Sequence, residues 1–123
     1  MYTFKDYEIE FADVSFEEKL TKAKELINNF CLDEFQSEAD FSDLSSVAIG
    51  YTTVTDEEIP LQIYVNLSTF VYEKYLEDIL VEATQYNSID ELIFYELNSL
   101  DFDEMAYVND KELEYYYSEK SMK

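Results

Sequence analysis

The side chains of this sequence that could do chemistry are almost all carboxylates. The chain has 29 Asp and Glu residues, whereas its 8 basic residues are all lysines and histidine is absent. Two carboxylates in a cleft can serve as acid and base in glycoside hydrolysis, but among 29 some pair always has a suitable spacing. A serine or the single cysteine would need a base to become a nucleophile, and no histidine can serve. We therefore expect no catalytic residues and no enzyme activity. A hydrolase that uses two carboxylates is kept only as the last of the alternatives weighed below.

The acidic run that begins at Asp101 comes nearest to a metal-binding loop. A calcium loop of the EF-hand type needs oxygen ligands at alternating positions, a glycine at the sixth position and a glutamate at the twelfth. Counted from Asp101, Met105 stands where the third ligand belongs and Ala106 where the glycine belongs, although Glu112 fits the last position. Zinc would need more cysteine or histidine ligands than this chain has. We expect neither a metal site nor a cofactor.

The negative charge of the chain is large and unevenly placed. The formal net charge is −21, and the segment from Glu25 to Asp110 contains 20 acidic residues and one lysine, Lys74. Because phosphates are bound mainly by Lys and Arg, we expect no direct binding to nucleic acid and none to an anionic membrane. Small soluble domains usually have a net charge of magnitude about 2–8, and a larger one destabilises the compact state by repulsion. The excess indicates a basic protein partner, and adaptation to high salt is an alternative explanation.

Regular secondary structure can hold carboxylates at a spacing that resembles that of phosphates. Acids on one face of a strand recur at about 6.6 Å and those one helical turn apart at about 6 Å, near two base-pair rises of DNA. Such a row could enter the basic groove of a nucleic-acid-binding protein and release counterions as DNA does. We expect the partner-binding acids in turns and at element ends, where side chains project most easily. They are Asp56, Glu57, Glu58, Glu73, Glu77, Asp78, Asp101, Asp103 and Glu104.

Two main helices are predicted by capping signals that precede an apolar stripe. Ser15 and Ser88 are each followed three residues later by a glutamate, the spacing of a capping box, and apolar residues then recur every three or four positions. These helices span about 15–31 and 88–100. A weaker pattern predicts a C-terminal helix over 111–119.

Strands are predicted where β-branched residues gather or where apolar and polar residues alternate. Residues 46–55 and 61–67 flank the acidic turn 56–58 and therefore predict a β-hairpin. A short strand is expected at 105–108, and the alternation at 7–11 predicts either an edge strand or an extended arm. The fold class is α+β, an antiparallel sheet of three to five strands packed against the two main helices.

Residues 70–86 fit two structures. On a helix, Tyr72, Leu76 and Ile79 would share an apolar face with other residues of the segment. Alternatively, two strands would flank a two-residue turn at Glu77, although such turns usually prefer Asn-Gly or Asp-Gly. We favour the hairpin, because a helix starts at Ser88 and a strand-to-helix junction needs only a short loop.

One domain over 1–123 is expected, with a frayed tail at 120–123. The 12 Tyr and 9 Phe residues supply burial that disordered acidic segments lack. Cys31 lies on the apolar stripe of the first helix, which predicts a buried thiol and a reducing compartment. Because the sequence has no secretory signal pattern and no apolar run that could span a membrane, we expect a cytoplasmic protein.

The size, the acidic central segment, the absence of arginine and the helix–strands–helix order resemble small acidic proteins that phages and mobile elements direct against host nucleases. The segments QYNSIDELI (85–93) and LDFDEM (100–105) resemble sequence segments of such proteins. The resemblance is to anti-CRISPR proteins of the DNA-mimic kind and to antirestriction proteins. It implies an inhibitor of a CRISPR effector or restriction enzyme in a bacterial host, and no site residue is carried over from it. The alternative is an acidic chaperone or structural partner of a basic nucleic-acid-binding protein.

Overall fold

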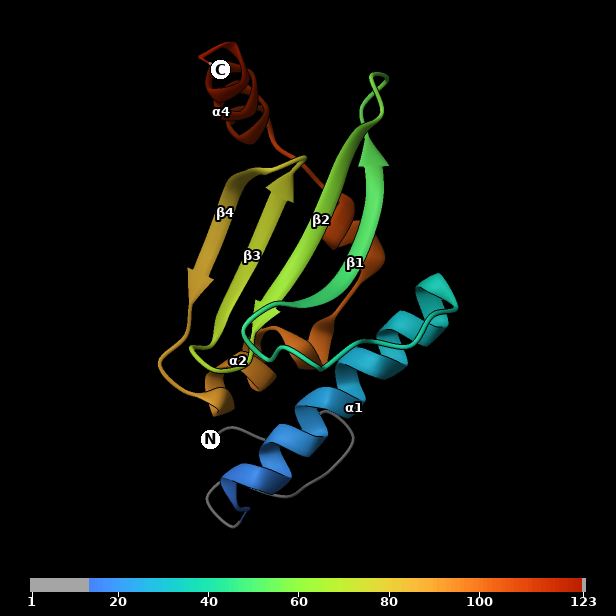
Figure 1. Ribbon diagram of the computed structural model, residues 1–123, viewed down its shortest axis with the longest axis vertical. Helices are drawn as coiled ribbons and strands as arrows, with labels where there is room; N and C mark the ends of the chain where they lie inside the picture. Colours follow the sequence, from blue (N-terminus) through green and yellow to red (C-terminus); the bar gives the residue numbers. More distant parts are fainter. Residues whose placement is uncertain (1–13, 123) are drawn as a thin grey trace.

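The computed structural model describes residues 14–122 and shows an α+β fold, with one four-stranded antiparallel sheet that is preceded and followed in the chain by helices (Figure 1). The predicted fold class is confirmed. The elements are α1 (Phe16–Phe35), β1 (Val47–Val54), β2 (Ile59–Asn66), β3 (Val71–Leu76), β4 (Ile79–Gln85), α2 (Ile89–Tyr95), the 3-10 helix η2 (Leu97–Ser99), α3 (Phe102–Ala106) and α4 (Asp110–Ser121). The edge strand or extended arm predicted at 7–11 lies outside the described residues.

The sheet is a meander in which each strand pairs with the next, in the order β1-β2-β3-β4. The hairpin predicted from 46–55 and 61–67 is β1 and β2, which pair from Val47 opposite Val65 to Val54 opposite Ile59. Consecutive antiparallel strands place the β1–β2 and β3–β4 turns at the same end of the sheet, as Figure 1 shows. This end is the one that α4 approaches.

Residues 70–86 form the favoured hairpin and not a helix. In β3, buried and half-buried residues alternate, and Tyr72, Lys74 and Leu76 face the core. The turn to β4 succeeds without glycine because Glu77 itself adopts the left-handed conformation, with φ of 57°. Leu80 would have lain on the apolar face of a helix but is exposed in the sheet.

Helix α1 begins as predicted and ends later. The Ser15 hydroxyl accepts a hydrogen bond from the backbone N–H of Glu18 at 3.2 Å. The helix continues past residue 31 to Phe35, because the Phe35 ring packs against other aromatic rings and stacks on Tyr51 of β1 at a centroid distance of 4.9 Å. The thiol of Cys31 is buried, as expected, and burial raises the pKa of this thiol.

The chain after the sheet differs from the prediction in two places. The helix expected over 88–100 ends at Tyr95 and is followed by η2, and residues 105–108 do not form a strand. Instead, the Asp101 carboxylate accepts hydrogen bonds from the backbone N–H groups of Asp103 and Glu104, and so starts α3 where we expected a helix to end. Met105 is buried on this short helix, so its apolar side chain reaches the core without a strand.

The predicted C-terminal helix is confirmed as α4, which has a full capping box between Asn109 and Glu112. It includes Lys120 and Ser121, which we assigned to a frayed tail. One face of the sheet packs on α1, α2, η2 and α3 and forms the core, while no described helix covers the face that carries Tyr64 and Tyr75 (Figure 1).

Candidate functional site

The fold divides the nine predicted partner-binding acids among three places. Five occupy the two hairpin turns at the α4 end of the sheet, and we call them the turn cluster: Asp56, Glu57, Glu58, Glu77 and Asp78. Asp101, Asp103 and Glu104 belong to α3 and its cap, on the helical side of the sheet. Glu73 lies in the middle of β3 and not at an element end, so the expectation that all nine sit in turns or at ends is wrong for this residue.

The β1–β2 turn projects its acids because its backbone is held locally. Thr55 accepts hydrogen bonds from the N–H groups of Glu57 and Glu58, at 3.2 Å to its hydroxyl and 3.1 Å to its carbonyl. Thr55 and Glu58 both have left-handed φ angles, of 66° and 53°. With the backbone turned in this way, all three acidic side chains of the turn are exposed.

Helix α4 joins the two turns through adjacent tyrosines. The Tyr117 hydroxyl donates to Oε2 of Glu57 at 2.9 Å, and the Tyr116 hydroxyl donates to Oε1 of Glu77 at 2.6 Å. Lys120, one turn further along, lies 3.1 Å from the same Glu77 oxygen. A single helix therefore holds one carboxylate from each turn.

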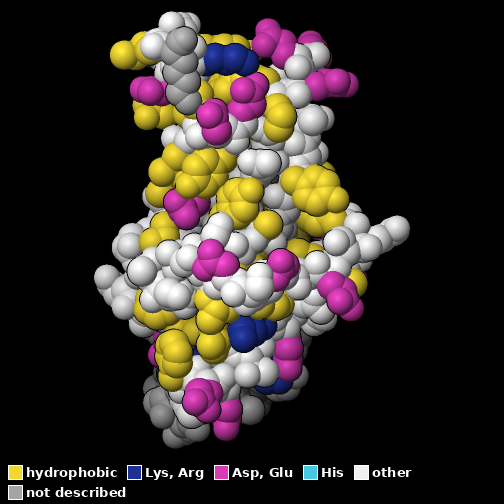
Figure 2. Space-filling view, in the orientation of Figure 1, with side chains coloured by type: hydrophobic (Ala, Val, Ile, Leu, Met, Phe, Trp, Pro, Cys, Tyr) yellow, Lys and Arg dark blue, Asp and Glu magenta, His cyan; other side chains and the backbone are white. Residues whose placement is uncertain are grey.

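Within the turn cluster, the contacts with α4 favour the ionised form of Glu77. The hydrogen bond from Tyr116, followed by that from Lys120, lowers the pKa of Glu77 below its ordinary value, although desolvation and then the charge of Asp78 oppose this shift. Figure 2 shows acidic side chains at the end of the molecule that carries α4, and further acidic side chains among apolar ones in the middle and at the opposite end of the same face. Glu73 is separate from this cluster and accepts a hydrogen bond from Tyr75 at 3.0 Å.

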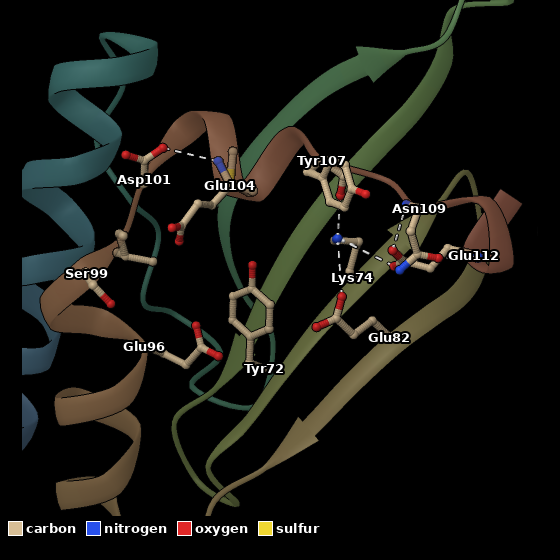
Figure 3. Close-up of a pocket in the computed structure, with 12 residues that line it drawn as sticks. Tyr72, Lys74, Glu82, Glu96, Ser99, Asp101, Glu104, Tyr107, Asn109 and Glu112 are labelled. Carbon is tan, nitrogen blue, oxygen red and sulfur yellow. Dashed lines mark hydrogen bonds and ion pairs between the residues drawn. The ribbon is translucent and has the colours of Figure 1, made fainter.

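A cavity of about 300 Å³ lies between β3, β4, η2, α3 and the start of α4, and we call it the acidic cavity (Figure 3). It brings Asp101 and Glu104 of the predicted set together with residues that we did not predict. Its charged and hydroxyl-bearing lining consists chiefly of Tyr72, Lys74, Glu82, Glu96, Asp101, Glu104 and Glu112. Asp103, from the same α3 turn, does not line it.

Lys74 occupies one end of the acidic cavity and is 4% exposed. Its Nζ donates to the carbonyl of Tyr107 at 2.7 Å and lies 3.3 Å from Glu82 and 3.5 Å from Glu112. The strand period could have indicated this arrangement, because a lysine between Tyr72 and Leu76 on the core face of a strand requires acidic partners. The sequence could not identify those partners, since they come from β4 and α4.

Two further groups give the cavity its electrostatic character. Desolvation raises the pKa of Glu96, and repulsion from Glu82 and Glu104 adds to this effect, while a 2.7 Å hydrogen bond from Tyr86 opposes it. Burial, followed by the neighbouring carboxylates, raises the pKa of Tyr72, so its hydroxyl stays protonated. The chemistry available here is the recognition of a cation by hydrogen-bond acceptors.

Within residues 14–122, no group of three or more Asp, Glu or Cys side chains is arranged to hold a metal ion. No helix in that range combines the length and apolar character needed to cross a bilayer. The chain matches no protein-family model, and no curated protein or solved structure is significantly similar to it.

Proposed function

We propose that this protein is a non-catalytic inhibitor that mimics the DNA backbone and occupies the basic nucleic-acid-binding surface of a host-defence nuclease, a CRISPR effector or a restriction enzyme, in the bacterial cytoplasm. The observation that carries this proposal is the turn cluster. Two turns bring five carboxylates to one end of the sheet, and α4 ties Glu57 and Glu77 to adjacent tyrosines. Carboxylates fixed in this way lose little freedom when they meet cationic side chains.

The placement of the lysines supports the same proposal. Lys74, the single lysine between Glu25 and Asp110, is buried against carboxylates of its own chain. It therefore does little to screen the acids on the surface. Tyr115 is exposed on α4 and Tyr117 borders the turn cluster, and exposed tyrosines provide contact area and ring faces to which a partner's arginines can bind.

The test begins with capture of binding proteins from bacterial cells and then measures displacement of DNA. A labelled DNA duplex bound to the captured nuclease should be released when the protein reaches a near-stoichiometric concentration. The affinity should fall steeply with salt, because the contact replaces phosphate contacts. Weak binding to several basic proteins, without DNA displacement, would instead favour an acidic chaperone.

Matched variants separate the turn cluster from net charge. The first is the triple variant Asp56→Asn, Glu57→Gln, Glu58→Gln. The control is Asp33→Asn, Glu34→Gln, Glu38→Gln, which removes the same charge from exposed positions at and after the end of α1. We expect the first to weaken DNA displacement by on the order of 10-fold or more and the control to change it little. Equal effects of both triple variants would contradict a role for the turn cluster.

A further inference from the structure

The acidic cavity carries more negative charge than its own lysine neutralises. The ammonium group of Lys74 donates a hydrogen bond to the carbonyl of Tyr107 and is already engaged in ion pairs with Glu82 and Glu112 at its own end of the cavity. At the other end of the cavity lie Glu96, Asp101 and Glu104, and among residues 14–122 no lysine forms an ion pair with any of them. This end lacks a cation.

Tyr72 indicates that the end without a cation is a site for a ligand. The side chain is 8% exposed, and unlike the hydroxyl of Tyr116, its hydroxyl forms no hydrogen bond with any residue of the described range 14–122. Figure 3 shows this hydroxyl pointing into the cavity, toward the side on which Asp101 and Glu104 lie. The hydroxyl oxygen is not among the fully buried atoms that lack a partner, so it is open to the cavity and can accept a hydrogen bond from a ligand there. A bound group with N–H donors would supply that hydrogen bond.

The shape of the acidic cavity selects the kind of cation. Its volume of about 300 Å³ is at the lower end for ligand pockets and suits a group of side-chain size. Its carboxylates come from different elements and do not converge in the way a metal ion requires. A planar guanidinium spreads its charge over five N–H donors and can bind separated acceptors, whereas an ammonium is a compact charge. Leu100 and Met105 also line the cavity and offer apolar contact to an alkyl stem.

We infer that the acidic cavity binds an alkylguanidinium, contributed in the inhibitory complex by an arginine side chain of the basic partner. The guanidinium N–H groups donate to Glu96, Glu104 and the hydroxyl oxygen of Tyr72. Tyr107, which is 66% exposed and also lines the cavity, provides a ring for the arginine to pack against. That the guanidinium comes from an arginine of the partner rests on the proposed function. That the cavity binds a guanidinium does not.

The direct test uses agmatine as the probe and the full chain as the receptor. In a two-dimensional NMR titration at low salt, agmatine should give saturable shifts confined to residues around Tyr72, Glu96 and Glu104. 1,5-Diaminopentane, an alkylammonium probe, should bind more weakly. Agmatine shifts that do not saturate, that spread over the acidic surface, or that 1,5-diaminopentane reproduces with equal affinity would overturn the inference.

Two single substitutions test whether Glu104 and Tyr72 bind the guanidinium group of agmatine. Glu104→Gln removes an exposed carboxylate, and Tyr72→Phe removes only the hydroxyl. Each should weaken agmatine binding about 3- to 10-fold, the effect of one lost hydrogen bond, while Glu38→Gln should leave it unchanged. Circular dichroism checks that each variant is folded. If Tyr72→Phe does not fold, the agmatine titration of Glu104→Gln still tests the inference. Agmatine binding to Glu104→Gln with the affinity of wild type overturns the inference.

The complex with the nuclease separates the two proposals. If agmatine binds in the cavity but the protein displaces no DNA, the cavity is a site for a small guanidinium compound and the proposed function fails. If DNA is displaced but agmatine does not bind, the cavity inference fails alone. If both occur, Glu104→Gln should weaken DNA displacement, and a partner arginine replaced by lysine should weaken it to a similar extent.

Discussion

Lys74 Nζ lies 2.7 Å from the carbonyl oxygen of Tyr107, and this hydrogen bond ties the middle of β3 to the segment between α3 and α4. Around the same ammonium group lie Glu82 and Glu112. The contact connects parts of the chain that are 33 residues apart and places a cation inside an otherwise strongly anionic protein.

Replacing Lys74 with methionine should destabilise the protein by about 3–5 kcal/mol, because Glu112 is then left buried without its cation. The double variant Lys74→Met, Glu112→Gln should recover part of this loss. Lys111→Met, at an exposed lysine on the same helix as Glu112, should change stability by less than about 0.5 kcal/mol. Urea denaturation measures all three, and a single Lys74→Met variant as stable as wild type would refute the role given to this ion pair.

Gly50 is required by contact with α3 and not by its backbone conformation. A Cβ atom at this position would collide with Sδ and Cε of Met105 and would lie 3.3 Å from the Phe35 ring. Gly50→Ala should therefore cost about 1–3 kcal/mol in urea denaturation. In a Met105→Ala background the same substitution should cost little, because the colliding side chain has been removed. Equal costs in both backgrounds would show that the two residues are not coupled.

Glu96 should make the protein less stable as the pH rises. Its pKa in the folded protein lies above the ordinary value of 4.5, so the folded state holds this proton more tightly than the unfolded state does. The contribution of Glu96 to stability therefore falls as pH rises from about 4.5 through the higher folded pKa, and the penalty is complete above it.

Glu96→Gln removes that penalty and can keep an acceptor for Tyr86. The variant should melt at a higher temperature than wild type at pH 7, and the advantage should shrink as pH falls toward 4.5. Melting curves at a series of pH values measure this difference. Glu114→Gln, at an exposed position, is the control, and an advantage of Glu96→Gln that does not depend on pH would contradict the assigned cause.

Tyr116 should govern part of the acid unfolding. Because its hydrogen bond is the largest cause that lowers the pKa of Glu77, the ionised Glu77 contributes stability above its ordinary pKa of 4.5 and loses it as pH falls through the folded value. Tyr116→Phe should lower the melting temperature at pH 7 and flatten its dependence on pH below 4.5. Tyr115→Phe, at the exposed neighbouring tyrosine, should do neither.

Salt should stabilise the protein. With a formal net charge of −21, repulsion between carboxylates opposes the compact state, and the screening length shortens from about 10 Å at 0.1 M to about 3 Å at 1 M salt. The melting temperature should rise over this range, and less so for the triple variant at Asp33, Glu34 and Glu38. A chain that is unfolded at 0.1 M salt and folds only in molar salt would favour adaptation to high salt over interaction with a partner.

The sequence by itself determined the features that depend on neighbouring residues. Ser15 and Ser88 start helices because their hydroxyls can reach an N–H group three residues ahead. The β1–β2 hairpin follows from its β-branched residues and acidic turn, and the net charge follows from composition alone. In each case the physical cause acts within a few positions of the chain.

Tertiary structure decided the features that depend on distant partners. Phe35 extends α1 because it finds the Tyr51 ring, and Met105 lies in a helix and not a strand because Asp101 caps α3 and leaves that side chain against Gly50. The acidic cavity also depends on residues that are far apart in the sequence. Its carboxylates come from β4 and three later segments, and no local period relates them, so only the packed fold could bring them around Tyr72.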